Sequence, residues 1–124
     1  QEVINDTQVG KKVRRVVFCT GKIYYDILAG KEAGNHSDVA VVRIEQLYPL
    51  PEWKLAEIFE QYKGAEFCWV QEEPKNQGTW LHLARYDFPS ALRYIGRKSS
   101  ASPATGYKKI YDKEQAEIVA ACFA

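Results

Sequence analysis

Short runs of apolar, mostly β-branched residues recur along the chain and predict buried strands. Glycines and polar turns separate the runs from the segments that follow them. Continuous apolar runs of this kind are typical of parallel strands that helices cover on both faces. The expected strands cover residues 13–19, 39–44, 67–70 and 92–96.

Between these runs, apolar residues recur at the three- and four-residue spacing of a helix face. Ile23, Ile27 and Leu28 predict a helix over residues 22–31 that ends near the glycines following it. Thr79 and Asp112 are expected to cap later helices. The expected apolar faces are Leu55, Ala56, Ile58 and Phe59 after the opening 49–51, Leu81, Leu83 and Ala84 after Thr79, and Ile118, Val119 and Cys122 after Asp112.

Strands that alternate with helices predict an α/β fold, a three-layer α/β/α sandwich with a mostly parallel sheet and right-handed crossovers. In such sheets, ligands and partners bind beyond the carboxyl ends of the strands. Functional residues are therefore expected in four loops, at 20–22, 45–48, 71–73 and 97–98.

Composition narrows the choice of partner and compartment. The chain has 124 residues, and its 17 basic and 16 acidic residues leave a net charge of +1, which gives no general attraction to nucleic acid or membranes. It carries neither an apolar stretch of bilayer length nor an apolar leader. Its three cysteines lack a C-x-x-C pair and read as buried free thiols, so we expect the bacterial cytoplasm or an equivalent reducing compartment. Because methionine is absent, we expect a piece of something longer.

The individual motifs do not predict an independent active site. Thr20-Gly21-Lys22 lacks the full phosphate-loop spacing and reads as a simple strand-to-helix turn. Adjacent Glu72 and Glu73 point to opposite sides of extended backbone, which is poor geometry for an acid and base acting on one bond. His36 and His82 lack partners at metal-ligand spacing, and a nucleophile motif is absent.

Two features leave alternatives open. The segment 97–106 places two cations before small and hydroxylated residues, so it either wraps a phosphate, docks on a neighbouring subunit or is a solvated connection. Trp53, Trp69 and Trp80, together with eight tyrosines, exceed what so small a core needs. Some of these aromatic side chains are expected to face another domain or chain.

Four motifs carry a resemblance to one family. They are CTGKIYYD at 19–26, VRIEQLYP at 42–49, WVQEEPKNQGTW at 69–80, and RYIGR at 93–97 leading into SASPATG at 100–106. In this order and spacing, the chain resembles the C-terminal domain of the 2-oxoglutarate dehydrogenase E1 component, a transketolase-like family. The resemblance implies a linker from a preceding domain over residues 1–12 and a transketolase C-terminal-like domain over 13–124.

The resemblance also implies an activity for the whole enzyme. Such an E1 is a homodimer that depends on thiamine diphosphate and magnesium, decarboxylates 2-oxoglutarate, and passes the succinyl group to the lipoyl arm of the E2 dihydrolipoyl succinyltransferase in the tricarboxylic acid cycle. Its cofactor lies between two preceding domains. The C-terminal domain contributes dimer contacts and regulatory surface, so we expect no catalytic residue, bound cofactor or metal in this fragment.

Some family members bind an acyl-CoA or adenine nucleotide effector through this domain. Anion recognition needs cations and amides at the strand ends, although Trp53-Lys54 stand where effector-sensitive relatives have consecutive arginines. Open alternatives are a free-standing effector-binding module, a pure interaction domain, and the E1 of a related acid such as 2-oxoadipate. The expected effector-binding residues are Lys22, Arg43, Gln46, Lys54, Arg97 and Lys98, and the expected interface residues are Glu72, Glu73, Asn76, Gln77 and Trp80.

Overall fold

The structure, a computed structural model, describes residues 2–99 and 108–124. Its centre is a five-stranded sheet with the strand order β1-β3-β2-β4-β5. Every neighbouring pair is parallel except β1 with β3. The strands are β1 (Val3–Ile4), β2 (Arg15–Cys19), β3 (Val39–Ile44), β4 (Glu66–Pro74) and β5 (Leu92–Arg97), and the helices are α1 (Ile23–Gly34), α2 (Glu52–Gln61), α3 (Trp80–Leu83) and α4 (Lys108–Phe123).

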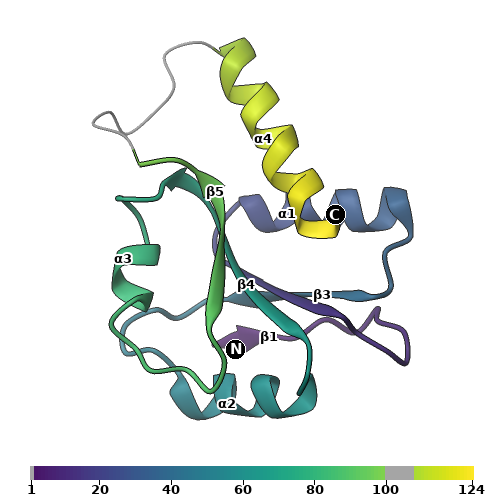
Figure 1. Cartoon of the computed structure of the whole chain (residues 1–124), viewed down its shortest axis with the longest axis vertical. Helices are drawn as coiled ribbons and strands as arrows, with labels where there is room; N and C mark the ends of the chain where they lie inside the picture. The colour runs from purple at the N-terminus through teal and green to yellow at the C-terminus, as the bar shows by residue number, and fades with distance from the viewer. Residues whose placement is uncertain (1, 100–107) are drawn as a thin grey trace.

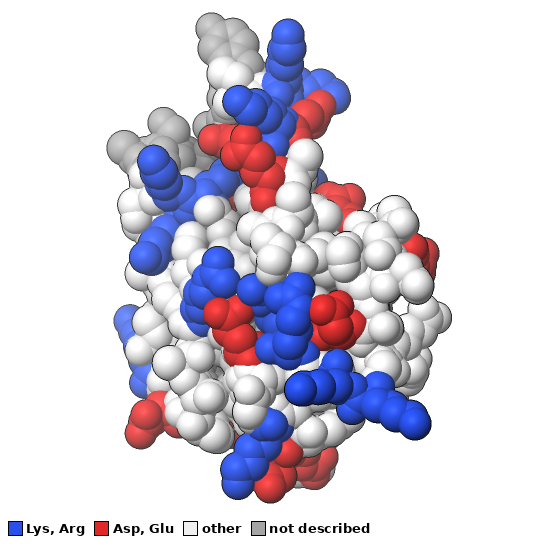
Figure 2. Space-filling view, turned by 45° about the vertical axis from the view of Figure 1, so that its right-hand side comes forward, with Lys and Arg blue, Asp and Glu red and all other residues white. Residues whose placement is uncertain are grey.

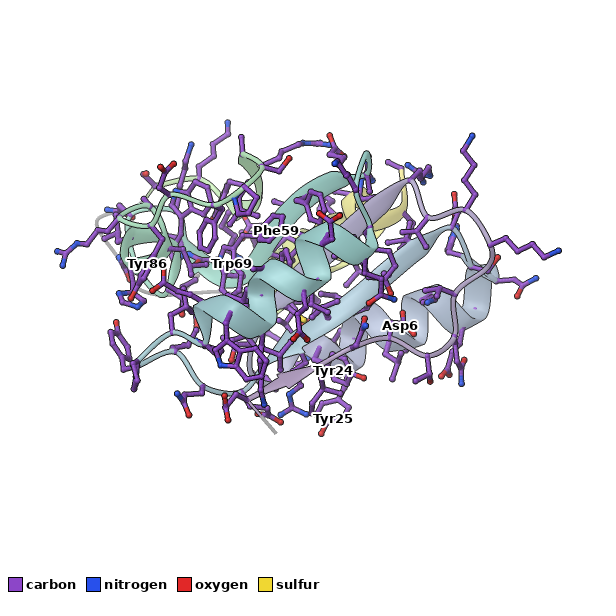
Figure 3. All side chains as sticks on the ribbon, turned by 90° about the horizontal axis from the view of Figure 1, so that it is seen from below. Asp6, Tyr24, Tyr25, Phe59, Trp69 and Tyr86 are labelled. Atoms are coloured by element: carbon purple, nitrogen blue, oxygen red, sulfur yellow. The ribbon has the colours of Figure 1, made fainter. Side chains whose placement is uncertain are left out.

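Helices cover both faces of the sheet, as expected for a three-layer α/β/α sandwich. Helices α1 and α4 lie together on one side, and α2 lies on the other (Figure 1). Alternate residues of β2 divide between the two cores: Val16 and Phe18 pack toward α2, whereas Val17 and Cys19 pack toward α1 and α4. Phe59 of α2 lies against the sheet near Trp69 (Figure 3). The sheet thus separates two apolar cores, one against α2 and one against α1 and α4.

The first residues belong to the sheet, although the sequence indicated only a polar lead there. Strand β1 pairs with the end of β3, with Val3 opposite Ile44. The carboxylate of Asp6 then forms a buried ion pair with Lys31 of α1 and accepts the amide of Val41 at 2.9 Å. Two apolar residues among polar ones gave too little periodicity to predict this strand.

Several expected boundaries are corrected. β4 runs through Glu72 and Glu73 to Pro74, where we expected a loop from residue 72. Helix α4 already includes Lys108, so Asp112 is not its cap but accepts the Lys108 ammonium at 2.7 Å one turn later. The expected 97–106 segment is described only to residue 99, and 100–107 lie outside the described residues.

The expected helix faces are mostly correct, with three exceptions, because Ala56, Leu81 and Ala84 are exposed. Leu55, Ile58 and Phe59 are buried on α2, whereas Ala56 is exposed. On α3, Leu83 is buried but Leu81 is 54% exposed, because a single turn of helix buries only one side against the sheet. The Thr79 side chain makes no capping hydrogen bond to α3. Within the described residues, no helix combines the length and apolarity that crossing a membrane requires.

Arg15 fastens the last helix to the first long strand. Its side chain is buried and donates from Nη1 to the carbonyls of Ala121, Cys122 and Ala124 at 3.0–3.2 Å. These carbonyls lie at the end of α4, where intrahelical partners run out. Arg15 therefore binds the free carbonyls at the end of α4 and ties this helix to the start of β2.

Candidate functional site

The carboxyl edge of the sheet brings residues from three separate expected loops together. Lys22 follows β2, Glu72 lies near the end of β4, and Arg97 ends β5. The ammonium of Lys22 lies 3.9 Å from Glu72 Oε1, and the guanidinium of Arg97 donates to the Glu72 carbonyl at 2.6 Å. The sequence placed these residues at one edge, and the structure places them in contact.

Glu72 is the acceptor that joins this edge to α4. Its Oε1 accepts the Tyr111 hydroxyl at 2.7 Å and the side-chain amide of Gln115 at 3.2 Å. The hydrogen bond to Glu72, together with burial, raises the pKa of Tyr111 to about 12. Glu72 is therefore occupied by neighbours from α4, and Glu73 is exposed, which confirms that the two carboxylates face different sides of the strand.

Arg97 is held by four contacts within the chain. Besides the Glu72 carbonyl, it binds the Glu114 carboxylate at 3.0 Å and the Tyr111 carbonyl at 3.2 Å, and its guanidinium lies 4.5 Å from the Tyr111 ring centroid. Its side chain is only 9% exposed. A guanidinium whose fork is used in this way holds α4 in place and has few donors left for a phosphate.

Gln71 organises the loop that follows β4. The sequence placed it in the expected functional loop 71–73 but assigned it no site role. Its Oε1 accepts the Trp69 indole and the Trp80 amide, both at 2.9 Å. Its amide nitrogen lies within hydrogen-bond distance of the carbonyls of Glu73, Pro74 and Gln77. The available signal was a glutamine continuing an apolar strand, since a polar side chain buried there must find partners.

A close approach of backbone explains the glycine of this loop. Gly78 has φ +70°, and an added Cβ would lie 3.1 Å from Cβ of Glu73 and 3.3 Å from the Gln71 amide nitrogen. A side chain is strained there on both counts. The motif at 69–80 therefore specifies a rigid loop shape around Gln71.

The remaining expected interface residues lie on the outside of this loop. Asn76 is exposed, and Gln77 is half-buried. Trp80 packs its ring 5.4 Å from that of Tyr94 and is also half-buried. Asn76 and Glu73 are thus exposed, Trp80 packs partly against the core, and Glu72 is turned inward.

The six expected effector-binding residues separate into two groups. Lys22, Arg97 and Lys98 lie on the Glu72 side of the edge, where Lys22 is 81% exposed and Lys98 is also exposed. Arg43, Gln46 and Lys54 lie around the end of β3. The structure thus places these residues in two separate groups of three and not in one six-residue cluster.

The β3 group is already engaged with neighbours. Arg43 donates to the Tyr25 hydroxyl at 3.0 Å, lies 3.4 Å from Glu45, and has the Tyr24 and Tyr25 rings 5.2 Å from its guanidinium (Figure 3). In the same group, the Gln46 amide donates to the Pro49 carbonyl at 2.7 Å, and the Lys54 ammonium lies 3.5 Å from Glu2.

The surface charges are mixed in sign. On the face shown in Figure 2, Lys and Arg side chains lie among Asp and Glu side chains and do not gather into one basic field. The mixed signs on this face agree with the net charge of +1.

The histidines and cysteines have structural surroundings. His36 stacks on Phe123 at 4.6 Å, and the Nε2 of His82 lies 3.1 Å from the Leu47 carbonyl. All three cysteines are free and buried, as the sequence predicted, and burial raises the pKa of each thiol, that of Cys68 to about 11. Among residues 2–99 and 108–124, no three His, Cys, Asp or Glu side chains gather closely enough to hold a metal ion.

Comparisons with known proteins agree with the motifs. The family model described as 2-oxoglutarate dehydrogenase C-terminal matches residues 1–123. The chain is 46% identical over 115 residues to the oxoglutarate dehydrogenase of Buchnera aphidicola, covering 88% of this chain and 13% of that protein. It is 46% identical over 116 residues to the 2-oxoglutarate dehydrogenase E1 component of Haemophilus influenzae, covering 88% and 12%.

The likeness extends to a mitochondrial protein. The 2-oxoglutarate dehydrogenase of Caenorhabditis elegans is 44% identical over 135 residues, covering 99% of this chain and 13% of that protein. The chain thus spans 12–13% of the length of these three relatives. With a family model matching nearly its whole length and relatives well above 40% identity, this chain belongs to the 2-oxoglutarate dehydrogenase C-terminal family.

Proposed function

We propose that the chain is the C-terminal assembly and regulatory domain of a 2-oxoglutarate dehydrogenase E1 whose full-length form decarboxylates 2-oxoglutarate and transfers the succinyl group to a lipoyl-bearing E2. The observation that carries the proposal is the family match over residues 1–123. In this view the protein works as a homodimer within a multienzyme complex of the tricarboxylic acid cycle, in the bacterial cytoplasm or an equivalent reducing compartment.

The use of polar groups at the carboxyl edge supports an assembly role. The side-chain amide nitrogen of Gln71 bonds the carbonyls of its own loop, and Arg97 bonds the Glu72 carbonyl of β4 as well as α4. The Glu72 carboxylate accepts hydrogen bonds from α4. These contacts give the edge a fixed shape, which is what a docking surface requires. Glu73 and Asn76 are exposed on this loop and lie on the surface that a neighbouring domain or subunit would contact.

Thiamine diphosphate and magnesium belong, in this proposal, to the preceding domains. The described residues do not fit the group: the carboxylates at the edge are paired with Lys22 and Arg43, and no metal-ligand cluster is found among residues 2–99 and 108–124. Calorimetry on the 124-residue chain is expected to give no saturable heat with thiamine diphosphate and Mg²⁺. Saturable binding would overturn this division of labour.

The activity is tested on the full-length polypeptide that contains these residues. With thiamine diphosphate and Mg²⁺, its kcat/KM for 2-oxoglutarate should exceed that for 2-oxoadipate by at least tenfold. The reverse preference would keep the domain assignment and replace the substrate. Turnover of neither acid would contradict the proposed function.

An anionic effector site is a separate, second proposal that rests on the exposed cations. Lys22 and Lys98 are the members of the expected set with freely exposed side chains beside the carboxyl edge. Titration of the full-length protein with AMP or acetyl-CoA, repeated with Lys22→Ala, tests it. Binding that weakens several-fold in the variant supports the site, and no heat at millimolar ligand contradicts it.

A further inference from the structure

Two aromatic side chains remain widely exposed where β3 leads into α2. Tyr48 is 72% exposed, and Trp53, in the first turn of α2, is 65% exposed. We call these two residues the exposed aromatic surface. Among the described residues, they are the two most exposed large hydrophobic side chains. Aromatic residues are enriched at protein interfaces because they bury much area at low entropic cost, so such exposure indicates a contact surface.

The N-terminal residues are fixed beside this surface. The Glu2 carbonyl accepts the amides of Glu45 at 2.8 Å and Gln46 at 3.2 Å, and the Glu2 carboxylate lies 3.5 Å from the ammonium of Lys54. That ammonium in turn lies 5.6 Å from the ring centroid of Trp53. Figure 1 shows the N-terminal end at β1, close to α2.

We propose that the exposed aromatic surface is covered by the part of the same E1 polypeptide that precedes residue 1. This inference rests on the proposed function, under which some seven-eighths of the polypeptide lies outside this chain, since the chain spans 12–13% of its relatives. The preceding polypeptide joins the domain at a point tethered through Lys54 to Trp53. It therefore reaches Trp53, and Tyr48 five residues before it, at a high effective concentration that a second copy does not share.

Site-specific photocross-linking in the full-length protein tests the proposal. The substitution Trp53→p-benzoylphenylalanine places the probe at the surface, and irradiation is followed by gel electrophoresis and peptide mapping. We expect a cross-link within one polypeptide to residues that precede this chain, at least tenfold above the yield from the same probe at Lys63. Lys63 is the matched control, because it is exposed just beyond the opposite end of α2.

Two other cross-linking results would overturn the inference. A cross-link that doubles the polypeptide mass shows that a second copy covers the surface, and a yield equal to that of the Lys63 control shows that nothing does. Decarboxylation of 2-oxoglutarate by the unsubstituted protein is measured alongside. Activity without an intramolecular cross-link contradicts this inference and supports the proposed function. An intramolecular cross-link without activity supports the inference and contradicts the proposed function.

Discussion

The indole of Trp69 donates to the side-chain carbonyl oxygen of Gln71 at 2.9 Å, two residues along the same strand. Trp69 is fully buried and Gln71 is 3% exposed, so this bond lies inside the α2 core. The same glutamine then binds the loop carbonyls as far as Gln77. One buried amide thus links the packing of the core to the shape of the surface loop.

Replacing this amide is expected to destabilise the domain and loosen the loop. Gln71→Leu leaves the Trp69 indole and the loop carbonyls without their partner, and we expect a loss of about 3 kcal/mol in unfolding free energy. Urea denaturation measures the loss, and hydrogen exchange measures faster opening at the Trp80 amide. Gln8→Leu, at an exposed position, is the control; equal stability of the two variants would refute the role of Gln71.

The crossing of α1 and α4 depends on Gly30. An added Cβ would lie 2.7 Å from Cγ1 of Val119, so Gly30→Ala is expected to cost about 1–3 kcal/mol despite the better helix propensity of alanine. In the double variant Gly30→Ala with Val119→Ala, the clash is removed, and the two effects should not add. Thermal unfolding of all four proteins gives the coupling. A stabilised Gly30→Ala chain would show that propensity outweighs the contact.

Acid should weaken the link between β2 and β4. Burial pushes the pKa of Glu66 up, but the hydrogen bond and charge of Arg15, with the charge of Arg93, outweigh it and hold the pKa below its usual value. The contribution of Glu66 to the unfolding free energy is therefore fully present above its unfolded pKa of about 4.3. It is lost as the pH falls through the lower pKa of the folded state.

The matched variant isolates that contribution. Because Glu66 is 43% exposed, solvent screening limits the contribution to about 1 kcal/mol. Glu66→Gln should lower the unfolding free energy by about that amount at pH 7 and flatten its decline below pH 5. An unchanged slope between pH 5 and pH 3 would contradict the assignment.

The three thiols should be unreactive in the folded chain. Burial raises the pKa of Cys122 to about 12 and also raises those of Cys19 and Cys68, so little thiolate forms at pH 8. Ellman's reagent is expected to find no fast-reacting thiol in the native chain and all three after unfolding in guanidinium. A thiol that reacts within seconds under native conditions would mean that its core opens locally.

The architecture could be predicted because its strands are continuous apolar runs. Val39–Ile44 was expected with the bounds that the structure gives it, and the helix faces at Ile23 and Leu55 came directly from their spacing. Strand β1 was missed because its two residues are held by pairing with β3 and by the distant ion pair of Asp6 with Lys31. Contacts between residues so far apart leave no local pattern.

The sequence predicted where the site lies but not which side chains pair within it. The sequence placed Glu72 and Arg97 at the carboxyl edge, because parallel strands end there together. It did not reveal that Arg97 is occupied by Glu114 and Tyr111, since they lie 17 and 14 residues further along the chain, on α4. Gln71 lay in the expected loop 71–73 but received no role, because four of its five partners belong to residues 73–80 and are brought to it only by the folded loop.

The central claim is that this chain is part of a much larger 2-oxoglutarate-decarboxylating enzyme. The most direct measurement is release of CO₂ from 2-oxoglutarate by the endogenous polypeptide captured from source lysate with an antibody against this chain. The account predicts release that depends on thiamine diphosphate, from a polypeptide many times larger than 14.2 kDa. A captured polypeptide of 14.2 kDa that releases no CO₂ would contradict it.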